Sequence, residues 1–218
     1  MRGVSLVGHR FSGANLTAVL LPSRRSWAFA TTGALEGRLA VETDGELLAS
    51  LSEQQLVNCD TGGFNKGCRG GHFIYALRYT AEKPAVTSAD YPYARAEGSC
   101  SSAGLVGYAV NDEGSSYVRV GRTEADFMEA LEAVGPLAVA IRASSDVFRF
   151  YRSGVIDTEE CMGVGSSVDH AVLLVGYGTD DASGADYWIL KNSQVAIRGR
   201  AGRPSSAAPL SALLAGAR

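Results

Sequence analysis

Apolar side chains between residues 27 and 41 recur at spacings of three and four, which predicts a helix on this stretch. Ser26 stands at its expected start, where a hydroxyl can accept a hydrogen bond from the unpaired amides of the first turn. Ser52 and Gln55 have the spacing of a capping box, which predicts a short second helix. A third helix is expected over residues 73–81.

After about residue 104 the pattern changes to short apolar, β-branched or aromatic runs bounded by glycine, serine and aspartate. These runs predict strands over 117–120, 137–141, 168–176 and 187–190. One helix is expected among them, capped by Thr123 with Asp126 and ended by Gly135 after Val134.

The first part of the chain is therefore mainly helical and the second mainly β, which predicts an α+β protein of two lobes with a cleft between them. The helical lobe is expected over about 23–104 and the β lobe over about 105–194. An atypical segment, residues 1–22, precedes them. The tail, residues 195–218, holds seven alanines and four arginines but no acid or aromatic residue, so it has little to bury.

The composition excludes several classes of protein. The 218 residues are 46% hydrophobic and 20% charged, which is typical of a globular protein. A net charge of −3 provides no positive field for nucleic acid. No apolar run approaches the ~20 residues that span a membrane. The run of residues 16–21 is too short for a signal peptide, so the N-terminus does not reveal a compartment.

The cysteines favour disulfides over a metal site. No two of them have the C-x-x-C spacing of a zinc site, and the three histidines are scattered, so neither a metal nor a cofactor is expected. An even number of widely spaced cysteines suits one or two disulfides, and free buried thiols are the alternative. The four cysteines are Cys59, Cys68, Cys100 and Cys161.

Three short segments carry the candidate chemistry. Ser26-Trp27-Ala28-Phe29-Ala30 opens a helix, Val168-Asp169-His170-Ala171-Val172 places a histidine in an apolar strand, and Leu190-Lys191-Asn192-Ser193 closes another strand. Each has an ordinary structural interpretation by itself: a helix cap for Ser26, a packed histidine for His170 and a turn residue for Asn192.

The order and separation of these segments resemble the papain-like cysteine peptidases. In that family a Cys-Gly-Ser-Cys-Trp-Ala-Phe segment opens the central helix, and a His-Ala pair and a Lys-Asn-Ser-Trp-Gly segment follow more than a hundred residues later. Six further segments stand in family order and bring the resemblance to roughly three quarters of the chain. They are LSEQQLVNCD from Leu51, GCRGG from Gly67, YPY from Tyr91, GPLAVAI from Gly135, FYRSGV from Phe150 and VGYG from Val175.

The resemblance implies a papain-like fold, with a helical N-terminal lobe and an antiparallel, β-barrel-like C-terminal lobe, and a peptidase site. His170 would be the base and Asn192 the residue that orients its ring. Ser26 occupies the position of the nucleophilic cysteine. A thiol there would be ionised by the histidinium and the helix N-terminus, whereas a serine hydroxyl cannot ionise near neutral pH.

Two further departures from the family pattern indicate impaired hydrolysis. Leu20 stands where the family has the glutamine of the oxyanion hole, and loss of one such donor typically costs ~10²–10³ in turnover. Gln194 replaces the tryptophan that shields the contact between asparagine and histidine.

By the same resemblance, Cys59 and Cys100 form a disulfide. The partner of Cys68 would be at Ser23, and the partner of Cys161 would lie in the lost C-terminal region, so both are expected as single thiols.

The resemblance also implies a peptide-binding site. Gly70 and Gly71 match the stretch that pairs with an extended peptide backbone. Four apolar residues match the pocket for the side chain two positions before the scissile bond, and packing between the lobes is the alternative for them. These four are Phe73, Ala140, Val168 and Ala171.

Three hypotheses follow. The first is a papain-like, cysteine-type peptidase family member, monomeric, whose hydrolysis of peptides or proteins is impaired by Ser26. The second is an inactive homologue that binds peptides or a partner protein. The third is an incomplete gene, with residues 1–25 and 195–218 produced by misplaced exon boundaries or a frame slip. The family resemblance implies a lysosomal, vacuolar or extracellular location.

Overall fold

A computed structural model describes most of the chain between residues 24 and 193. The described residues are 2–8, 24–102, 104–109, 117, 119–120, 123–144, 146–151, 155–156, 168–181, 184–193 and 213–214. The predictions that concern Leu20, Ser23, Cys161, Gln194 and most of the tail lie outside these residues.

The chain divides into two compact units. One, the helical unit, is residues 24–139, and the other, the sheet unit, holds residues 1–23 and 140–218. The division falls within strand β4, Leu137–Ile141.

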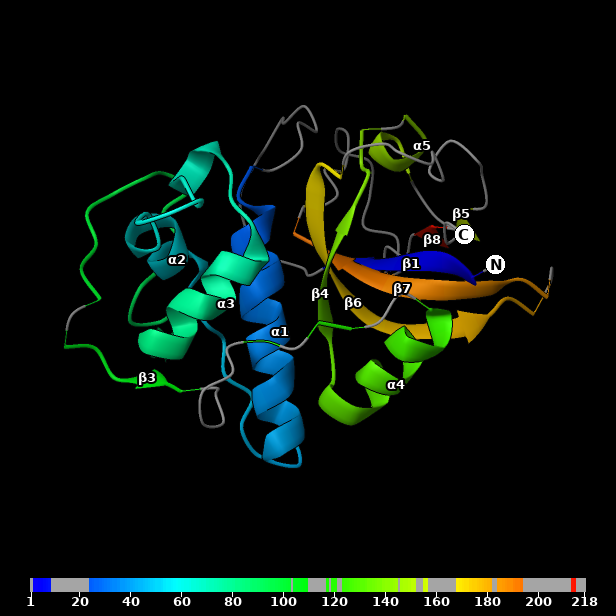
Figure 1. Ribbon diagram of the computed structural model, residues 1–218, viewed down its shortest axis with the longest axis horizontal. Coiled ribbons are helices and arrows are strands. Elements are labelled where there is room, and N and C mark those ends of the chain that lie inside the picture. The colour runs from blue at the N-terminus through cyan, green and yellow to red at the C-terminus, as the bar shows by residue number, and fades with distance from the viewer. Residues whose placement is uncertain are drawn as a thin grey trace, which may run out of the picture. The chain divides into compact units, whose positions relative to one another are not determined.

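The helical unit contains all three helices predicted in the first half of the chain and the one predicted after residue 123 (Figure 1). The described part of this unit also holds two short strands and a 3₁₀ turn, besides the first residues of β4. The elements are α1 (Ser26–Glu42), α2 (Glu53–Cys59), η1 (Gly67–Arg69), α3 (Phe73–Glu82), β2 (Ala85–Val86), β3 (Gly107–Tyr108) and α4 (Glu124–Val134).

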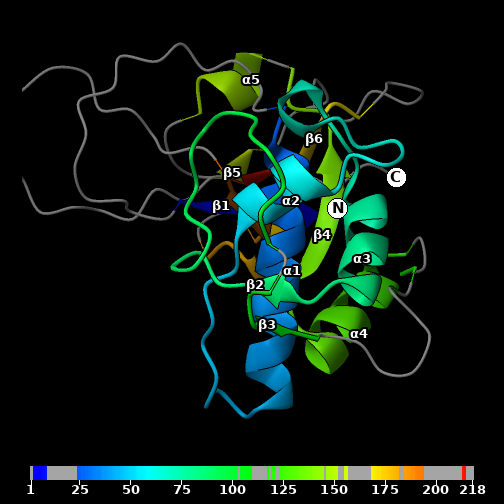
Figure 2. The same ribbon diagram turned by 90° about the vertical axis from the view of Figure 1, so that its left-hand side faces the viewer.

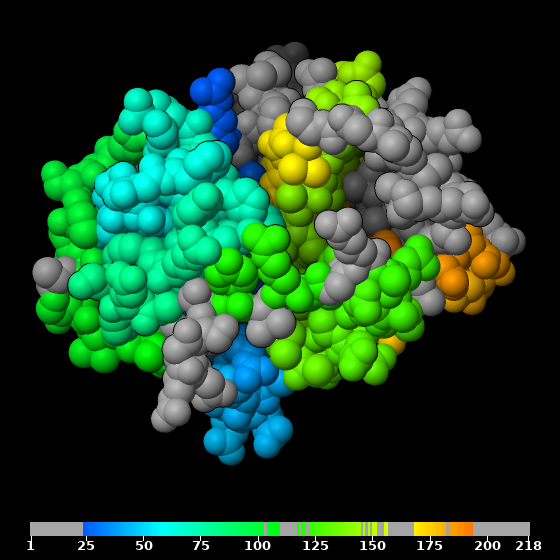
Figure 3. Space-filling view, viewed as in Figure 1, coloured from blue at the N-terminus to red at the C-terminus, as the bar shows by residue number. Residues whose placement is uncertain are grey.

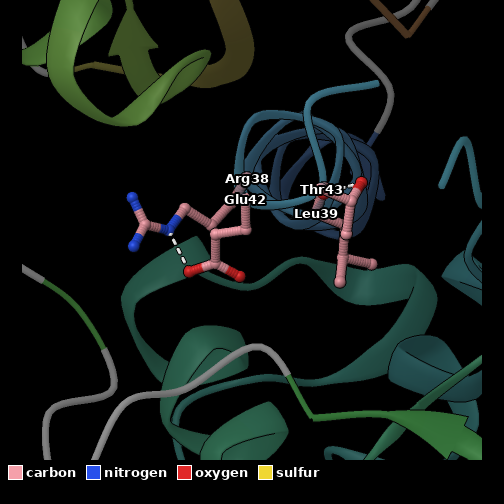
Figure 4. Close-up of polar contacts among 4 residues, drawn as sticks. All are labelled: Arg38, Leu39, Glu42 and Thr43. Atoms are coloured by element: carbon pink, nitrogen blue, oxygen red, sulfur yellow. Dashed lines mark hydrogen bonds and ion pairs between the residues drawn. The ribbon is translucent and has the colours of Figure 1, made fainter. Parts of the chain in front are cut away.

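The two ends of α1 are held differently. Its N-cap is Arg25, which makes no side-chain cap hydrogen bond, so Ser26 is the first residue inside the helix and not its cap. At the other end, the Thr43 hydroxyl donates to the Leu39 carbonyl at 2.8 Å, and Arg38 Nε donates to Glu42 Oε1 at 2.6 Å (Figure 4). Both contacts span one helical turn.

Only one of the two hydrogen bonds of the predicted capping box of α2 is present. The Ser52 hydroxyl accepts from the Gln55 N–H as expected. The side chain of Gln55, however, donates to the Pro84 carbonyl and accepts from the Val86 N–H, at 2.9 and 3.0 Å. It therefore anchors β2 instead of closing the box. In α4 the box of Thr123 and Asp126 is complete, which confirms that prediction.

Apolar burial joins these elements. Leu35 and Leu39 of α1 form a buried cluster with Leu51 and Ala85, and Tyr108 packs against it. This brings β2 and β3 beside α1 (Figure 2). Removal of this apolar surface from water is the dominant stabilising contribution.

The sheet unit is built on a six-stranded sheet in the order β4-β6-β7-β1-β5-β8. Strands β6 (His170–Thr179) and β7 (Asp186–Asn192) pair antiparallel, with Leu173 opposite Lys191. The remaining elements are β1 (Arg2–Gly8), α5 (Asp146–Arg149), β5 (Val155–Ile156) and β8 (Leu213–Leu214).

Two details of the β region differ from the prediction. Antiparallel pairing holds for β6 with β7 and for β1 with β5, but β1 with β7 and β5 with β8 are parallel. The strand predicted over 117–120 is wrong, because Tyr117, Arg119 and Val120 are not in a strand. The Tyr117 hydroxyl instead accepts from Arg78 of α3, at 3.0 Å. Within the described residues, no helix is long and apolar enough to cross a membrane.

Candidate active site

The helical unit supplies Ser26 and its surroundings. Ser26 is buried at the first position of α1, and the Trp27 side chain beside it is 1% exposed. The Trp27 indole N–H donates to the carbonyl of Gly67 at 3.4 Å. This contact ties the start of α1 to η1, and therefore to the glycines that follow η1.

Gly70 and Gly71 need to be glycines for different reasons. Gly70 has φ +125° and ψ 171°, a conformation that residues with a Cβ rarely adopt. A Cβ on Gly71 would lie 2.6 Å from Cε2 of Trp27 and 2.5 Å from Oδ1 of Asn65. The backbone is held by the Lys66 N–H, which donates to the Gly70 carbonyl at 2.8 Å.

Phe73 is the first residue of α3 and is half-buried. Its ring centroid lies 4.6 Å from that of His72. Farther along α3, Tyr75 stacks on Phe64 with centroids 5.2 Å apart, and both rings are exposed. The outer surface of α3 is visible in Figure 3.

Arg25 makes contacts that the sequence does not predict. Its guanidinium donates to the thiol of Cys68 at 3.6 Å and to the Arg95 carbonyl at 2.5 Å, and it lies 5.7 Å from the Tyr93 ring centroid. Cys68 is a free, half-buried thiol, as the resemblance implies. No local signal indicates these contacts, because their partners lie 43 and 70 residues away along the chain.

The disulfide implied by the resemblance, between Cys59 and Cys100, is present in the helical unit. It joins the end of α2 to the segment after Tyr91. Cross-links of this kind stabilise a fold mainly by restricting the unfolded chain.

The sheet unit brings His170 and Asn192 together. His170 is the first residue of β6 and Asn192 the last of β7, so antiparallel pairing places them at the same end of the two strands. His170 Nε2 lies 2.8 Å from Asn192 Oδ1. The amide oxygen can only accept, so Nε2 carries the proton and a neutral ring has its lone pair on Nδ1.

His170 Nδ1 is buried and has no hydrogen-bond partner among the described residues. Burial lowers the pKa of His170 below its ordinary value, while the hydrogen bond to Asn192 and the charge of Asp169 act in the opposite direction. The ring is therefore neutral at neutral pH, with its basic nitrogen on Nδ1. That is the state that a general base requires.

Neighbouring residues fix the start of β6. The Asp169 carboxylate accepts from the Ala143 N–H at 2.6 Å, and the Asp169 N–H donates to the Ile141 carbonyl at 3.0 Å. The Phe148 ring lies edge-on to His170, with centroids 6.0 Å apart.

The predicted pocket residues are shared between the two units. Phe73 belongs to the helical unit, and the other three to the sheet unit. Ala171 is buried, whereas Ala140 is exposed and Val168 is 58% exposed. Their role as a pocket remains a prediction. Ser26 and the pair His170–Asn192 likewise belong to different units. Within the described residues, no three His, Cys, Asp or Glu side chains cluster as metal ligands.

The chain is an α+β protein in which a long helix opens on Ser26 and Trp27, and a buried histidine is hydrogen-bonded to a half-buried asparagine at the ends of two adjacent strands. This is the framework of a cysteine-peptidase-type hydrolase. Comparisons with known proteins identify the family. The profile described as "Papain family cysteine protease" matches residues 24–202. The chain belongs to the papain family of cysteine proteases.

Individual relatives agree with this assignment. Cathepsin L1 of Drosophila melanogaster is 43% identical over 169 residues, which are 77% of this chain and 43% of the relative. The solved structure of digestive procathepsin L 3 from Tenebrio molitor larval midgut has a TM-score of 0.67 at 37% identity, and the match covers 78% of this chain and 53% of that one.

A Carica candamarcensis cysteine protease, solved in complex with E-64, has a TM-score of 0.61 at 30% identity, over 79% of this chain and 81% of that one. The papain-like α+β fold is therefore established. The chain spans about half the length of the curated relatives it matches.

Proposed function

We propose that this chain is a papain-like peptidase homologue in which Ser26 stands at the nucleophile position. With serine at this position, the chain hydrolyses peptide bonds slowly or not at all. The observation that carries the proposal is the residue before Trp27: a serine opens α1, while His170 Nε2 lies 2.8 Å from Asn192 Oδ1. This contact supports the assignment of His170 and Asn192 as the family's His–Asn pair.

The chemistry of a hydroxyl supports impaired turnover. In this family the thiol is expected to ionise before attack, because the histidinium and the helix N-terminus stabilise the thiolate. A serine must instead lose its proton during attack, and needs a base and an oxyanion hole arranged for that transfer. Lowering of the pKa of His170 by burial further disfavours an ion pair.

Peptide binding without hydrolysis is the second candidate function. The Gly70–Gly71 backbone is held by contacts to Lys66 and Trp27 that do not involve the Ser26 hydroxyl. Replacement of the nucleophile would therefore leave this backbone able to pair with an extended peptide, with a peptide or a partner protein as the ligand.

A turnover assay separates the two functions. The purified chain is incubated with a dipeptidyl fluorogenic substrate that has a bulky apolar residue in its second position. We expect no measurable release of the fluorophore, with binding of the uncleaved peptide retained. Turnover that His170→Ala abolishes would instead show that the serine form is an active peptidase.

A further inference from the structure

A buried amide lies directly beneath Gly71. Asn65 precedes η1 and is 1% exposed. Its Nδ2 donates to the Asp60 carboxylate at 2.5 Å, and its Oδ1 accepts from the His72 N–H at 2.6 Å. The side chain thus connects the residue that follows α2 to the residue that precedes α3.

The two partners permit one orientation of this amide. An ionised Asp60 only accepts hydrogen bonds and a backbone N–H only donates, so Nδ2 must face Asp60 and Oδ1 must face His72. The hydrogen bond from Asn65 also lowers the pKa of Asp60, against the larger effect of burial, which raises that pKa. Asp60 in turn follows Cys59, which the disulfide to Cys100 fixes.

Gly71 is confined on both sides by this arrangement. Its Cα carries no side chain because Asn65 Oδ1 and the Trp27 indole occupy that space. On either side of it along the chain, the Gly70 carbonyl and the His72 N–H are already hydrogen-bonded. Gly71 itself donates and accepts no hydrogen bond within the described part of the chain. The N–H and C=O of Gly71 are therefore fixed in place and available for hydrogen bonds to a ligand.

We infer that Asn65, oriented by Asp60, is a positioning residue that holds the Gly71 backbone for pairing with an extended peptide. The inference rests on the proposed function, because it requires that the chain bind peptides. Hydrogen bonds weaken steeply when the donor angle departs from linearity, so a small rotation of the Gly71 backbone would lose the pairing. Asn65 acts through Gly71 and need not touch the ligand.

The test compares two ligands on matched variants. One ligand is the peptide acetyl-Ala-Phe-Arg-amide, and the other is its depsipeptide, in which an ester oxygen replaces the phenylalanine N–H. Titration calorimetry gives both Kd values for the unaltered chain, for Asn65→Ala and for Gln54→Ala. Gln54 is the control because it is an equally buried amide that holds Ala94 and Ala96 instead of His72.

We expect the unaltered chain to prefer the amide roughly 5- to 10-fold, as loss of one hydrogen bond predicts. Asn65→Ala should reduce this preference to about twofold or less, whereas Gln54→Ala should keep it even if its Tm falls. A loss of fold stability alone would weaken both ligands equally and leave the ratio unchanged. Should Asn65→Ala fail to fold, the ratio for Asp60→Ala, which frees the amide to turn, decides the question.

Two results would overturn the inference, and they are distinguishable. An unchanged ratio in Asn65→Ala or Asp60→Ala refutes the positioning role and leaves peptide binding intact. Failure of the unaltered chain to bind either ligand, at concentrations up to about 1 mM, refutes peptide binding and the positioning role with it.

Discussion

At the scale of single residues, the chemistry of this chain depends on which atoms can give up or accept a proton. His170 Nε2 is hydrogen-bonded to Asn192 Oδ1, and His170 Nδ1 has no hydrogen-bond partner among the described residues. A histidine held in this way can accept a proton from a nucleophile. In the proposed function, Ser26 offers a hydroxyl where the family has a thiol, so His170 would keep the role of base while the ionisable nucleophile is replaced.

The contact between Asn192 and His170 shifts the pKa of His170 in a direction that can be measured. Since the amide oxygen favours the protonated ring, Asn192→Leu should lower the pKa of His170 still further. Asn192→Asp, similar in size but charged, should raise it, by about 1–3 units for an adjacent opposite charge. NMR titration of the histidine Cε1–Hε1 resonances measures both. His72, in the helical unit, is the internal control, and shifts of the same sign in both variants would contradict the assignment.

The stability of the fold should follow the same titration. The pKa of His170 is lower in the folded chain than in the unfolded chain. As the pH falls, the unfolded chain therefore binds more protons than the folded chain does. This residue therefore contributes no destabilisation above pH ~6.5 and an increasing one below it, until the folded state is also protonated.

Some residue contacts could be predicted from the sequence and others could not. The pairing of His170 with Asn192 could be predicted, because both residues stand in recognisable motifs at the ends of adjacent strands. The contact of Arg25 with Cys68 could not be predicted, because the two residues lie 43 positions apart along the chain. The contacts of Asn65 with Asp60 and His72 could not be predicted either, because no sequence pattern identifies the partner of a single polar side chain.

At the scale of elements, the segment from η1 to α3 is held by contacts on several sides. It is fixed by the Trp27 indole, by Asn65 and by the turn at Gly70. Its glycines are therefore steric requirements and not signs of flexibility.

Gly71→Ala tests this constraint. The new methyl group would overlap the Trp27 ring and Asn65 Oδ1, so we expect a loss of about 1–3 kcal/mol in the free energy of unfolding, as for an overpacked site. Gly63→Ala, in the segment between α2 and η1, is the control, because its Cβ would meet nothing within 4 Å. Thermal or urea unfolding of both variants gives the comparison, and equal stabilities would show that the segment can move aside.

Elements with a strong local signal were predicted well. The period of apolar residues in α1 and the capping pair of α4 depend on the helix itself. The predicted capping bond of the Gln55 side chain is absent, because its amide is hydrogen-bonded to the backbone of Pro84 and Val86 at β2 instead. The strand over 117–120 failed because four alternating residues are too few to distinguish a strand from an extended loop.

At the scale of the whole molecule, the chain is two units with different secondary structure, and the candidate catalytic residues are divided between them. The parallel pairing of β1 with β7 could not be foreseen, because residues 1–22 have no clear period. A reaction that needs both Ser26 and His170 is therefore a property of the full chain, and a direct test must report on both units at once.

Covalent labelling at residue 26 is that test. The unaltered chain, Ser26→Cys and Ser26→Cys with His170→Ala are each treated with a thiol-directed epoxide, and the modified residue is located by peptide mapping, which separates it from Cys68. We expect no modification of residue 26 in the unaltered chain, rapid modification in Ser26→Cys, and a loss of that modification without His170. An unreactive thiol in the Ser26→Cys variant, or one that reacts equally well without His170, would contradict the proposal that residue 26 stands at the nucleophile position and that His170 acts as its base.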